Sequence, residues 1–399
     1  ACAVLMITSS GVWYSASVFF VALLNEFGRG YAFTAGVFSV FTAIYGCSGM
    51  LVGGLVDRFG ARRVILAGCL LAPLALAGNS LAPTLQFMYV THSILVAVAL
   101  TAMGYIPVSI LLTHEFQRHR GLAISIASAG VGIGILAVVP LTQFAIEHAG
   151  WRLAYVTLAL LALVLGLPVR LLALRETRPV HEQRREYAVS DGHAMLRTAE
   201  RPVWTLTSAI RSREFWLVTV TFTLLNSPTQ LALTHHVAHL VETGHPKSFV
   251  AGIVGLIGLV SIPGKILWGY LSDRWWAELV YLAGTSCLIA ALVALLLIGP
   301  ATAAWGLVVY AVLMALGYAV SAAMTPVLCG RFFSGPHFGI IFGTLSILYN
   351  LGGAIGVWLA GYILDATASY QLAFLGSIVS AAIAAGCVWI AAPRRVAPH

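Results

Sequence analysis

The sequence predicts an all-α membrane protein with twelve transmembrane helices, arranged as two six-helix repeats. Sixty per cent of its 399 residues are apolar and 9% are charged, whereas about a quarter of the residues in soluble domains are charged. The mean hydropathy of +0.92 agrees with this composition. A soluble globule of this length could not bury so much apolar surface, so the expected surroundings are a lipid bilayer.

A short motif that occurs twice predicts the internal repeat. Residues 53–58, Gly-Gly-Leu-Val-Asp-Arg, are echoed by residues 269–274, Gly-Tyr-Leu-Ser-Asp-Arg, 216 positions later. The pair at 120–121, Arg-Gly, precedes an apolar run as the pair at 338–339, Phe-Gly, does, 218 positions later. A nearly constant offset indicates two copies of one structural unit in parallel order. In a membrane protein this duplication is typical of transporters that bind their substrate between the halves.

The spans follow from the charged breaks, because a membrane-spanning helix needs about 20 apolar residues. The first 24 residues carry no charge, so they lack the basic start of a signal peptide and predict a first spanning helix. The expected spans are 3–24, 31–55, 64–81, 85–113, 121–146, 151–174, 215–240, 248–272, 279–299, 302–329, 338–363 and 371–392. They define an N-terminal six-helix bundle (1–174), a polar cytoplasmic linker (175–214) and a C-terminal six-helix bundle (215–399).

The charge distribution predicts that both termini are cytoplasmic. With that orientation, 18 of the 22 Lys and Arg residues fall in inside segments, 3 fall in outside segments, and Lys265 lies within a span. This asymmetry follows the positive-inside rule. The net charge of +8 therefore indicates membrane topology rather than nucleic-acid binding. The expected location is the cell inner (plasma) membrane, crossed many times.

The sequence contains none of the patterns that would indicate an enzyme. It has no phosphate-binding Gly-x-x-x-x-Gly-Lys loop, so transport would run on solute or ion gradients rather than on ATP. No nucleophile–base pair or metal-ligand spacing emerges, and we expect no catalytic residue, cofactor or metal. The six cysteines fall in or beside spans and are interpreted as small core residues: Cys2, Cys47, Cys69, Cys287, Cys329 and Cys387.

The repeated motif suggests a gate. Asp57 and Arg58 in the first copy, like Asp273 and Arg274 in the second, follow a small-residue helix end at the expected cytoplasmic surface. A carboxylate there could pair with a neighbouring helix in one state and release it in another. The alternative is that the arginines only anchor the topology, but this would leave the carboxylate in both copies unexplained.

Lys265 is the one formal charge well inside an expected span, since all 14 acidic residues lie in loops or at span ends. A lysine at mid-membrane costs about 2.5–3.5 kcal/mol on insertion scales, so it implies a cavity or a mobile counter-ion. An anionic substrate is the natural partner. The alternative is that its side chain snorkels to the inner surface, because Asp273 is only about 12 Å further along the helix. The helical face above Lys265 consists of small residues: Ala251, Val254, Gly258 and Ser261.

Polar side chains on other spans could complete a substrate cavity. Tyrosines could donate hydrogen bonds to a carboxylate while their rings pack against the alkyl part of the substrate. The alternative is ordinary packing, since polar residues often join membrane helices. The candidate substrate contacts beside Lys265 are Tyr14, Tyr105, Tyr318, Gln230 and Asn350.

Three histidines near the expected outer end of span 215–240 also need an interpretation. His235 and His239 are four residues apart, with His236 between them. That spacing suits a metal ion or a titrating proton. No third ligand is evident from the sequence, and passive packing at the membrane interface is the simpler expectation.

Several stretches resemble the major facilitator superfamily. Beside the two Asp-Arg motifs, the features typical of that superfamily are Gly60 with Arg62 and Arg63, Arg-Gly-Leu-Ala at 120–123, and Gly-Trp-Arg at 150–152. The second motif departs from the family pattern, because Trp275 and Trp276 replace the expected glycine and basic pair. The resemblance covers essentially the whole chain and implies the major facilitator fold.

Other stretches resemble the branch that contains oxalate/formate antiporters and monocarboxylate transporters. They are Phe-Phe at 19–20, Glu-Phe-Gly at 26–28, Gly-Lys-Ile-Leu-Trp-Gly at 264–269 and Gly-Tyr-Ile-Leu-Asp at 361–365. This branch usually has a cation at the place of Lys265, which engages the substrate carboxylate. Monocarboxylate transporters of animals tend to have an Asp where this chain has Ser261.

The resemblance also bears on the class of anion. Oxalate carriers have a second cation in the eleventh helix, where this chain offers only uncharged residues such as Ser346, Tyr349 and Asn350. One cation matches one carboxylate, so we expect a carrier of small monocarboxylates, similar to lactate or pyruvate. A proton is the expected co-transported ion, with the charge balanced by Lys265 or by the substrate acid.

Three other functions remain open on the sequence alone. An anion exchanger of the oxalate/formate type would keep its site cationic and return only when loaded. A major facilitator exporter of amphipathic compounds would use the apolar cavity and would be insensitive to Lys265→Ala. A non-transporting membrane sensor is disfavoured, because the linker and tail leave little room for a signalling domain.

Overall fold

A computed structural model of the chain describes all residues except 29–30, 117–118, 169–203, 368 and 392–399. The described residues form helices and connections, without strands. Most of the expected linker, up to residue 203, lies outside this description, and the short helix α10 (Leu206–Arg211) follows it. The chain forms two compact units, each made of three segments: unit 1 of Ala1–Glu115, Ile133–Ala209 and Phe333–Thr344, and unit 2 of Phe116–Gly132, Ile210–Phe332 and Leu345–His399.

The first half of the chain supplies most of unit 1. Within it, α3 packs against α4 and α6, and α4 packs against α6 and η1. Its helices, in order, are α1 (Cys2–Tyr14), α2 (Ala16–Phe27), α3 (Tyr31–Phe59), α4 (Ala61–Ser80), α5 (Leu85–Val90), the π-helix η1 (Thr91–Val96), α6 (Ala97–Met103), α7 (Tyr105–Glu115), α8 (Arg120–Leu161) and the π-helix η2 (Ala162–Gly166).

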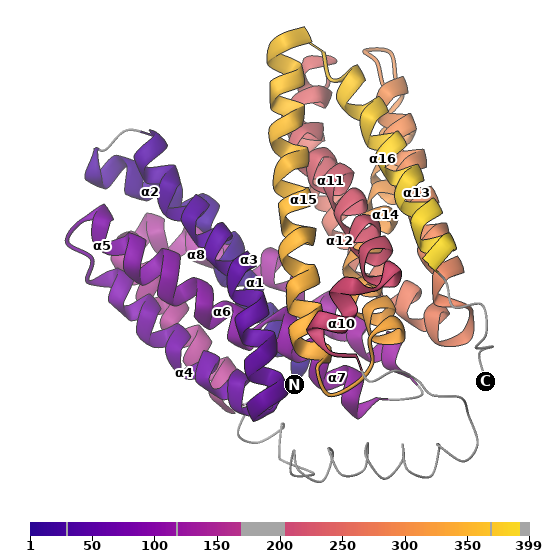
Figure 1. The fold of residues 1–399 in the computed structure, drawn as a ribbon. Helices are drawn as coiled ribbons and strands as arrows, with labels where there is room; N and C mark the ends of the chain where they lie inside the picture. The colour runs from indigo at the N-terminus through magenta and orange to yellow at the C-terminus, as the bar shows by residue number, and fades with distance from the viewer. Residues whose placement is uncertain (29–30, 117–118, 169–203, 368, 392–399) are drawn as a thin grey trace, which may run out of the picture. The chain divides into compact units, whose positions relative to one another are not determined.

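The second half supplies most of unit 2, whose helices lie side by side (Figure 1). In this unit α14 packs against α12 and α13, and α16 packs against α11 and α13. The helices are α11 (Arg213–Glu242), α12 (Lys247–Arg274), α13 (Ala277–Leu297), α14 (Ala304–Phe332), α15 (Phe338–Thr367) and α16 (Gln371–Ala391). The starts of α8 and α15 are divided from the rest of their helices, since residues 116–132 belong to unit 2 and 333–344 to unit 1.

Ten helical segments of the described chain are long and apolar enough to cross a membrane. The expected spans 121–146 and 151–174 merge into one of these segments, although Gly150 (φ 80°) interrupts the helical backbone between them. A glycine tolerates this positive φ because it has no Cβ. The 30-residue α11 is not among the ten, because polar side chains such as Asn226 and Gln230 lower its hydropathy. Twelve spans and cytoplasmic termini therefore stay predictions.

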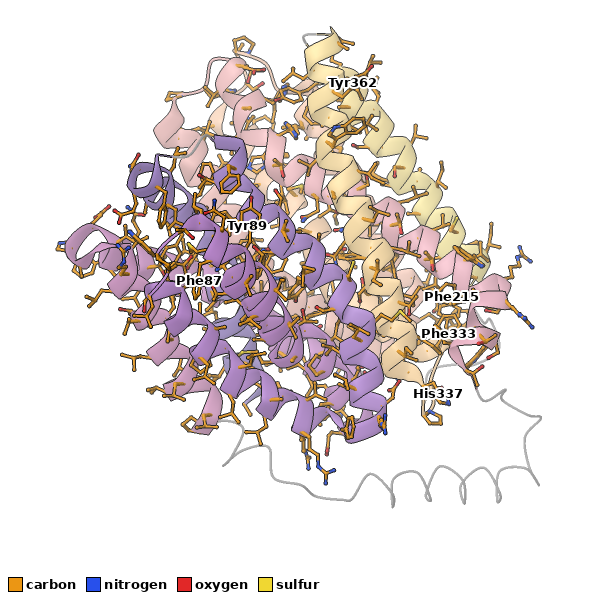
Figure 2. All side chains as sticks on the ribbon, turned by 60° about the vertical axis from the view of Figure 1, so that its left-hand side comes forward. Phe87, Tyr89, Phe215, Phe333, His337 and Tyr362 are labelled. Atoms are coloured by element: carbon orange, nitrogen blue, oxygen red, sulfur yellow. The ribbon has the colours of Figure 1, made fainter. Side chains whose placement is uncertain are left out.

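Aromatic side chains occupy both interior and exposed places. Tyr89, labelled on α5 in Figure 2, donates its hydroxyl to the Phe33 carbonyl at 2.8 Å and ties α5 to α3. Tyr362, labelled near the end of α15, is 61% exposed and stacks on Trp358, with ring centroids 5.7 Å apart. An exposed aromatic pair near the end of a span is typical of the membrane–water interface.

The core of unit 2 depends on close backbone approach between α13 and α14. A Cβ added at Gly317 would lie 2.6 Å from the Leu288 Cα and 2.7 Å from its backbone nitrogen. These are backbone atoms, so the helices would have to separate. Small residues at helix contacts are the usual way in which membrane helices gain packing contacts, because lipid supplies no hydrophobic driving force between them.

We therefore predict that Gly317→Ala destabilises the protein by about 1–3 kcal/mol, the usual cost of overpacking. Gly376 on α16 is the matched control, since a Cβ added there meets nothing within 4 Å. Gly376→Ala should be neutral or stabilising, because alanine favours helix by up to about 1 kcal/mol. Thermal unfolding of the detergent-solubilised variants tests this, and equal midpoints would contradict the packing argument.

Candidate functional site

Lys265 lies in the interior of unit 2. It sits on α12 and is 1% exposed, so its side chain does not reach the surface of this structure. Its ammonium lies 4.8 Å from the centroid of the Tyr318 ring on α14, a cation–π contact. Among the described residues it forms no ion pair and no hydrogen bond. The ring attracts the positive charge but leaves the three N–H donors available to an anion.

Packing between α12 and α14 holds this pair in place. One turn along α12, the Trp268 indole donates a hydrogen bond to the Leu316 carbonyl of α14 at 2.9 Å. On the other side, a Cβ added at Gly264 would lie 3.2 Å from the Ala319 Cβ. The glycine therefore allows the two helices to meet closely beside Lys265, and the indole hydrogen bond sets their register.

The small-residue face expected above Lys265 is only partly packed. Ser261 is buried and donates its hydroxyl to the Gly258 carbonyl of its own helix at 2.7 Å. A serine is uncharged, so this position offers Lys265 no counter-ion. A Cβ added at Gly255 or Gly258 would meet nothing within 4 Å. Of the four residues of this face, Gly258 therefore has open space beside it, whereas Ser261, one turn from Lys265, is buried.

The other sequence-predicted substrate contacts are distributed over both units. Gln230 on α11 is exposed, and Asn350 on α15 donates its amide to the Ser346 carbonyl one turn earlier at 2.8 Å. In unit 1, Tyr14 ends α1 and is 41% exposed, and Tyr105 begins α7 with partial burial. Only Tyr318 is seen in contact with Lys265. The role of the other four stays a prediction.

Two polar side chains of α11, Thr223 and Asn226, join this helix to α15. Asn226 donates its amide to the Tyr349 carbonyl of α15 at 2.8 Å, and Thr223 donates to the Leu348 carbonyl at 3.2 Å. A Cβ added at Gly352 on α15 would lie 2.5 Å from the Thr223 carbonyl oxygen. The two helices are thus in very close contact, and these polar side chains join them. For Asn226 and Thr223, the observed role is therefore packing between helices.

Asp57 binds the start of a helix within unit 1. Its carboxylate oxygens accept hydrogen bonds from the backbone N–H groups of Gly339 and Ile340, both at 2.8 Å. These residues begin α15, where the first N–H groups have no partner within the helix and the helix dipole is positive. The carboxylate therefore caps α15 from another helix.

Asp273 does the same within unit 2. It accepts from the N–H groups of Gly121 and Leu122 at the start of α8, again both at 2.8 Å. The sequence identified the carboxylates but not these partners. The sequence did contain a signal for these partners. Arg-Gly at 120–121 and Phe-Gly at 338–339 repeat at almost the same offset as the two Asp-Arg motifs.

The two arginines of the motif lie on the surface. Arg58 rests over the Phe59 ring at 5.1 Å, and Arg274 rests over the Tyr270 ring at 4.3 Å, each on a residue of its own helix. Both side chains are exposed. The carboxylates therefore make the contacts between helices, whereas the arginines stay where they can also anchor the topology.

Two ion pairs next to the motifs occupy equivalent places with the charges exchanged. Arg62 on α4 binds Glu115 at the end of α7 at 2.6 Å, and Glu278 on α13 lies 3.8 Å from Arg331 on α14. Each member of the first pair precedes its counterpart by 216 residues. Arg331 also donates to the Ser272 carbonyl at 3.1 Å, beside Asp273. This ion pair therefore supports the second motif.

A further ion pair joins two stretches that the sequence singled out. Arg152 donates to the Glu26 carboxylate at 2.8 Å, and its guanidinium lies over the Trp151 ring at 4.2 Å. The hydrogen bond from Arg152 lowers the pKa of Glu26 below its usual value. Both partners are exposed, so the pair contributes little to stability.

The histidines of α11 are held by hydrogen bonds rather than by a metal-like arrangement. His235 places Nε2 3.1 Å from the Val357 carbonyl and Nδ1 3.3 Å from the Tyr370 hydroxyl. His239 places Nε2 3.1 Å from the Leu295 carbonyl. No group of three His, Cys, Asp or Glu side chains in the described part of the chain could hold a metal ion.

Comparison with known proteins identifies the family to which this chain belongs. The sequence profile of the Major Facilitator Superfamily matches residues 2–328 and 253–399. The chain belongs to the Major Facilitator Superfamily. It is therefore a multi-pass membrane transporter and not an enzyme, and the expected fold class is confirmed at the level of an all-helical major facilitator fold.

Curated relatives of this superfamily member include monocarboxylate transporters. Monocarboxylate transporter 13 of Bos taurus is 27% identical over 377 residues, which cover 92% of this chain and 82% of the relative. Monocarboxylate transporter 4 of Mus musculus is 26% identical over 90% of this chain and 75% of the relative. Monocarboxylate transporter 3 of Rattus norvegicus is 29% identical over 94% of this chain and 75% of the relative.

Solved major facilitator structures are similar over almost the full length. A variant of the E. coli fucose:proton symporter FucP has a TM-score of 0.73 at 15% identity, over 97% of this chain and 98% of that chain. The proton:xylose symporter XylE, bound to 6-bromo-6-deoxy-D-glucose, has a TM-score of 0.73 at 12% identity, over 98% and 93%. At these identities the similarity shows the fold alone.

The cation–π contact can be tested by a double-mutant cycle of Lys265→Met and Tyr318→Leu. Cation–π pairs contribute about 0.5–2 kcal/mol, and the cycle separates this coupling from the loss of ring packing. We expect a coupling of that size in the unfolding free energy of the substrate-free protein. Additive effects of the two substitutions would mean that the ring does not stabilise the ammonium.

The carboxylate caps can be tested at Asp273. Hydrogen bonds to a charged group contribute about 1.5–3 kcal/mol each, and partial exposure places these toward the lower end. Asp273→Ala should therefore lower the thermal midpoint clearly, and Asp273→Asn, which keeps one acceptor oxygen, should lower it less. The control is Glu147→Ala, because this exposed carboxylate accepts only from Gln143 on its own helix. Equal midpoints for Asp273→Ala and Glu147→Ala would disprove the capping role.

Proposed function

We propose that this transporter carries small monocarboxylates, similar to lactate and pyruvate, across the cell inner (plasma) membrane in symport with a proton. The observation that supports it is the buried ammonium of Lys265, which has an aromatic face beside it and no carboxylate partner among the described residues. A buried cation without a counter-charge is costly, and a substrate carboxylate removes that cost.

The number of cations argues for one carboxylate rather than two. Among the described residues, Lys265 is the only buried Lys or Arg. On α15, the groups that could contact a second carboxylate are uncharged: Ser346, Tyr349 and Asn350. The Tyr349 hydroxyl lies 3.3 Å from the Ser321 hydroxyl, so uncharged groups meet here. A dicarboxylate would keep one charge without a cation. The relatives named monocarboxylate transporters support the same choice.

The remaining candidate residues enter the proposal in three roles. Tyr318 holds the ammonium, and Tyr14, Tyr105, Gln230 and Asn350 are proposed to contact the rest of the substrate. Asp57 and Asp273, with Arg58 and Arg274 beside them, are proposed to act as gates. Their hydrogen bonds to helix starts would form in one state of an alternating-access cycle and break in the other. The bundles 1–174 and 215–399 would move as the two bodies of this cycle.

The decisive experiment is uptake of radiolabelled L-lactate into proteoliposomes, with and without an inward proton gradient. Lys265→Met should lower lactate uptake by about 10- to 100-fold, the factor that corresponds to a lost charge-assisted hydrogen bond of about 1.5–3 kcal/mol. Lys265→Arg keeps the charge and should retain part of the activity. Lys247→Met, at the only other lysine of the chain, is the control and should transport as the wild type does.

Competition by pyruvate, acetate, formate and oxalate defines the substrate class in the same assay. Stronger competition by monocarboxylates than by oxalate is expected, because the site has one cation. Net uptake driven by a pH gradient without any substrate on the opposite side would exclude an obligatory anion exchanger. If no carboxylate is transported or competes under any gradient, the assignment of Lys265 fails and an exporter of amphipathic compounds becomes the better interpretation.

A further inference from the structure

Two buried side chains of unit 2 are neighbours, and each has a polar atom without a hydrogen-bond partner in the described chain. His236 on α11 is 2% exposed, and Tyr310 on α14 is fully buried. Their rings lie 6.2 Å apart between centroids. The Nε2 atom of His236 and the hydroxyl of Tyr310 are both buried, and neither forms a hydrogen bond within the described chain. Buried polar atoms are normally paired, so this pair requires an explanation.

The protonation of the His236 ring follows from its other nitrogen. The Nδ1 atom lies 2.7 Å from the Ala232 carbonyl, one turn earlier on α11. A carbonyl can only accept a hydrogen bond, so Nδ1 must carry a proton. In the neutral ring the lone pair is then on Nε2. The one basic nitrogen of this side chain is therefore Nε2, the buried atom that has no hydrogen-bond partner within the described chain.

We propose that His236 and Tyr310 form the binding site for the co-transported proton. A hydroxyl suits this role, because it can donate to a neutral Nε2 and accept from a protonated one, directly or through one water molecule. Such a hydrogen bond, which this structure does not contain, would satisfy Nε2 in both protonation states, so that the proton could bind and leave. The only bond that forms or breaks is Nε2–H, and the proton comes from bulk water on one side and returns to it on the other.

Four other histidines lack this arrangement. The Nε2 atom of His245 is also buried without a hydrogen-bond partner in the described chain, but no aromatic ring lies in contact with it. His235 and His239 each direct Nε2 toward a carbonyl group, and Nδ1 of His235 lies beside the Tyr370 hydroxyl. In unit 1, Nδ1 of His92 lies 3.1 Å from the Asn79 amide, whose oxygen accepts from the Thr91 hydroxyl at 2.5 Å. That contact fixes the Asn79 amide as a donor, so Nδ1 of His92 cannot take a proton without breaking it.

Within the described part of the chain, no charged side chain forms an ion pair or a hydrogen bond with His236. On α11 the neighbouring titratable groups are His235, His239 and Glu242. From α14 the neighbouring group is Tyr310. Tyr370, directly before α16, contacts His235, and the Leu295 carbonyl of α13 contacts His239. The basic residues of α12, which also packs against α11, are Lys247, Lys265 and Arg274. α16 contains no charged residue, and Arg331 at the far end is the only charged residue of α14. Proton binding here is therefore governed by the hydroxyl and by access to water.

The proposed proton site rests on the proposed function and adds to it the place where the co-transported proton binds. Tyr310 and Tyr318 both lie on α14, eight residues apart, which corresponds to about 12 Å along the helix. The proton would thus bind between α11 and α14, and the carboxylate would bind between α12 and α14. α14 is the element shared by the two sites, and a shift of this helix would be sensed by both.

The test uses the full-length protein in proteoliposomes, with L-lactate as the probe and an inward gradient of one pH unit. One coupled proton per lactate sets the accumulation ratio at about tenfold, since one pH unit is a tenfold difference in proton activity. His236→Asn keeps a donor for the Ala232 carbonyl but has no basic nitrogen. His239→Asn, three residues further along the same helix, is the matched control. Lactate counterflow at uniform pH reports carboxylate binding separately.

We expect about tenfold accumulation in the wild type and in His239→Asn, and none in His236→Asn, which should still exchange lactate. If His236→Asn does not fold, Tyr310→Phe decides, because it lacks only the hydroxyl and should also lose accumulation. Full accumulation by His236→Asn or Tyr310→Phe would overturn the proposal. So would a wild type that exchanges lactate without accumulating it, although the Lys265 site would then stand. A wild type without exchange would reject both.

Discussion

A polar or charged group inside a bilayer must find its partner within the protein, because no water is available there. Lys265 shows the consequence most clearly. Its ammonium is buried in unit 2 and meets the face of Tyr318, which offers attraction but no hydrogen-bond acceptor. The partner that the protein supplies is thus incomplete. A carboxylate would complete it, and the function proposed here depends on this one unsatisfied charge.

The same constraint explains the two carboxylates at the helix starts. The first N–H groups of a helix have no partner inside it, and α8 and α15 both begin where the chain emerges from a short connection. Asp57 and Asp273 satisfy two such groups each, with all four distances at 2.8 Å. The duplicated element is therefore a contact between a carboxylate and a helix start, and the arginine beside each carboxylate is not part of it.

The ion pairs next to these contacts show how the duplicated halves diverged. Arg62 with Glu115 and Glu278 with Arg331 occupy equivalent positions, and the sign of each charge is exchanged. What the two halves retain is an ion pair between equivalent helices, α4 and α7 in the first half and α13 and α14 in the second. Either order of the charges fulfils that requirement, because the attraction depends on opposite signs and not on which helix carries which.

Much of this protein could be derived from local sequence. Apolar composition, span length and the repeated Asp-Arg motif determined the fold class, and Lys265 was identified by being the only charge deep within a span. These features depend on short-range patterns and on the cost of charge in lipid, which a single sequence displays. The boundary near Gly150 was also predictable, since glycine marks a break in the apolar pattern.

Only the tertiary structure decided which polar residues are used up in packing and which are not. Asn350, a predicted substrate contact, donates its amide to the Ser346 carbonyl of its own helix, and the polar residue Asn226 of α11 donates to the Tyr349 carbonyl of α15. Conversely, His236 and Tyr310 are 74 residues apart and come together only when α11 packs against α14. Periodicity gives the face of a helix, but the rotation and register of one helix against another depend on side-chain packing across the whole unit. That is why the partners of Asp57, Asp273 and Lys265 emerged only from the fold.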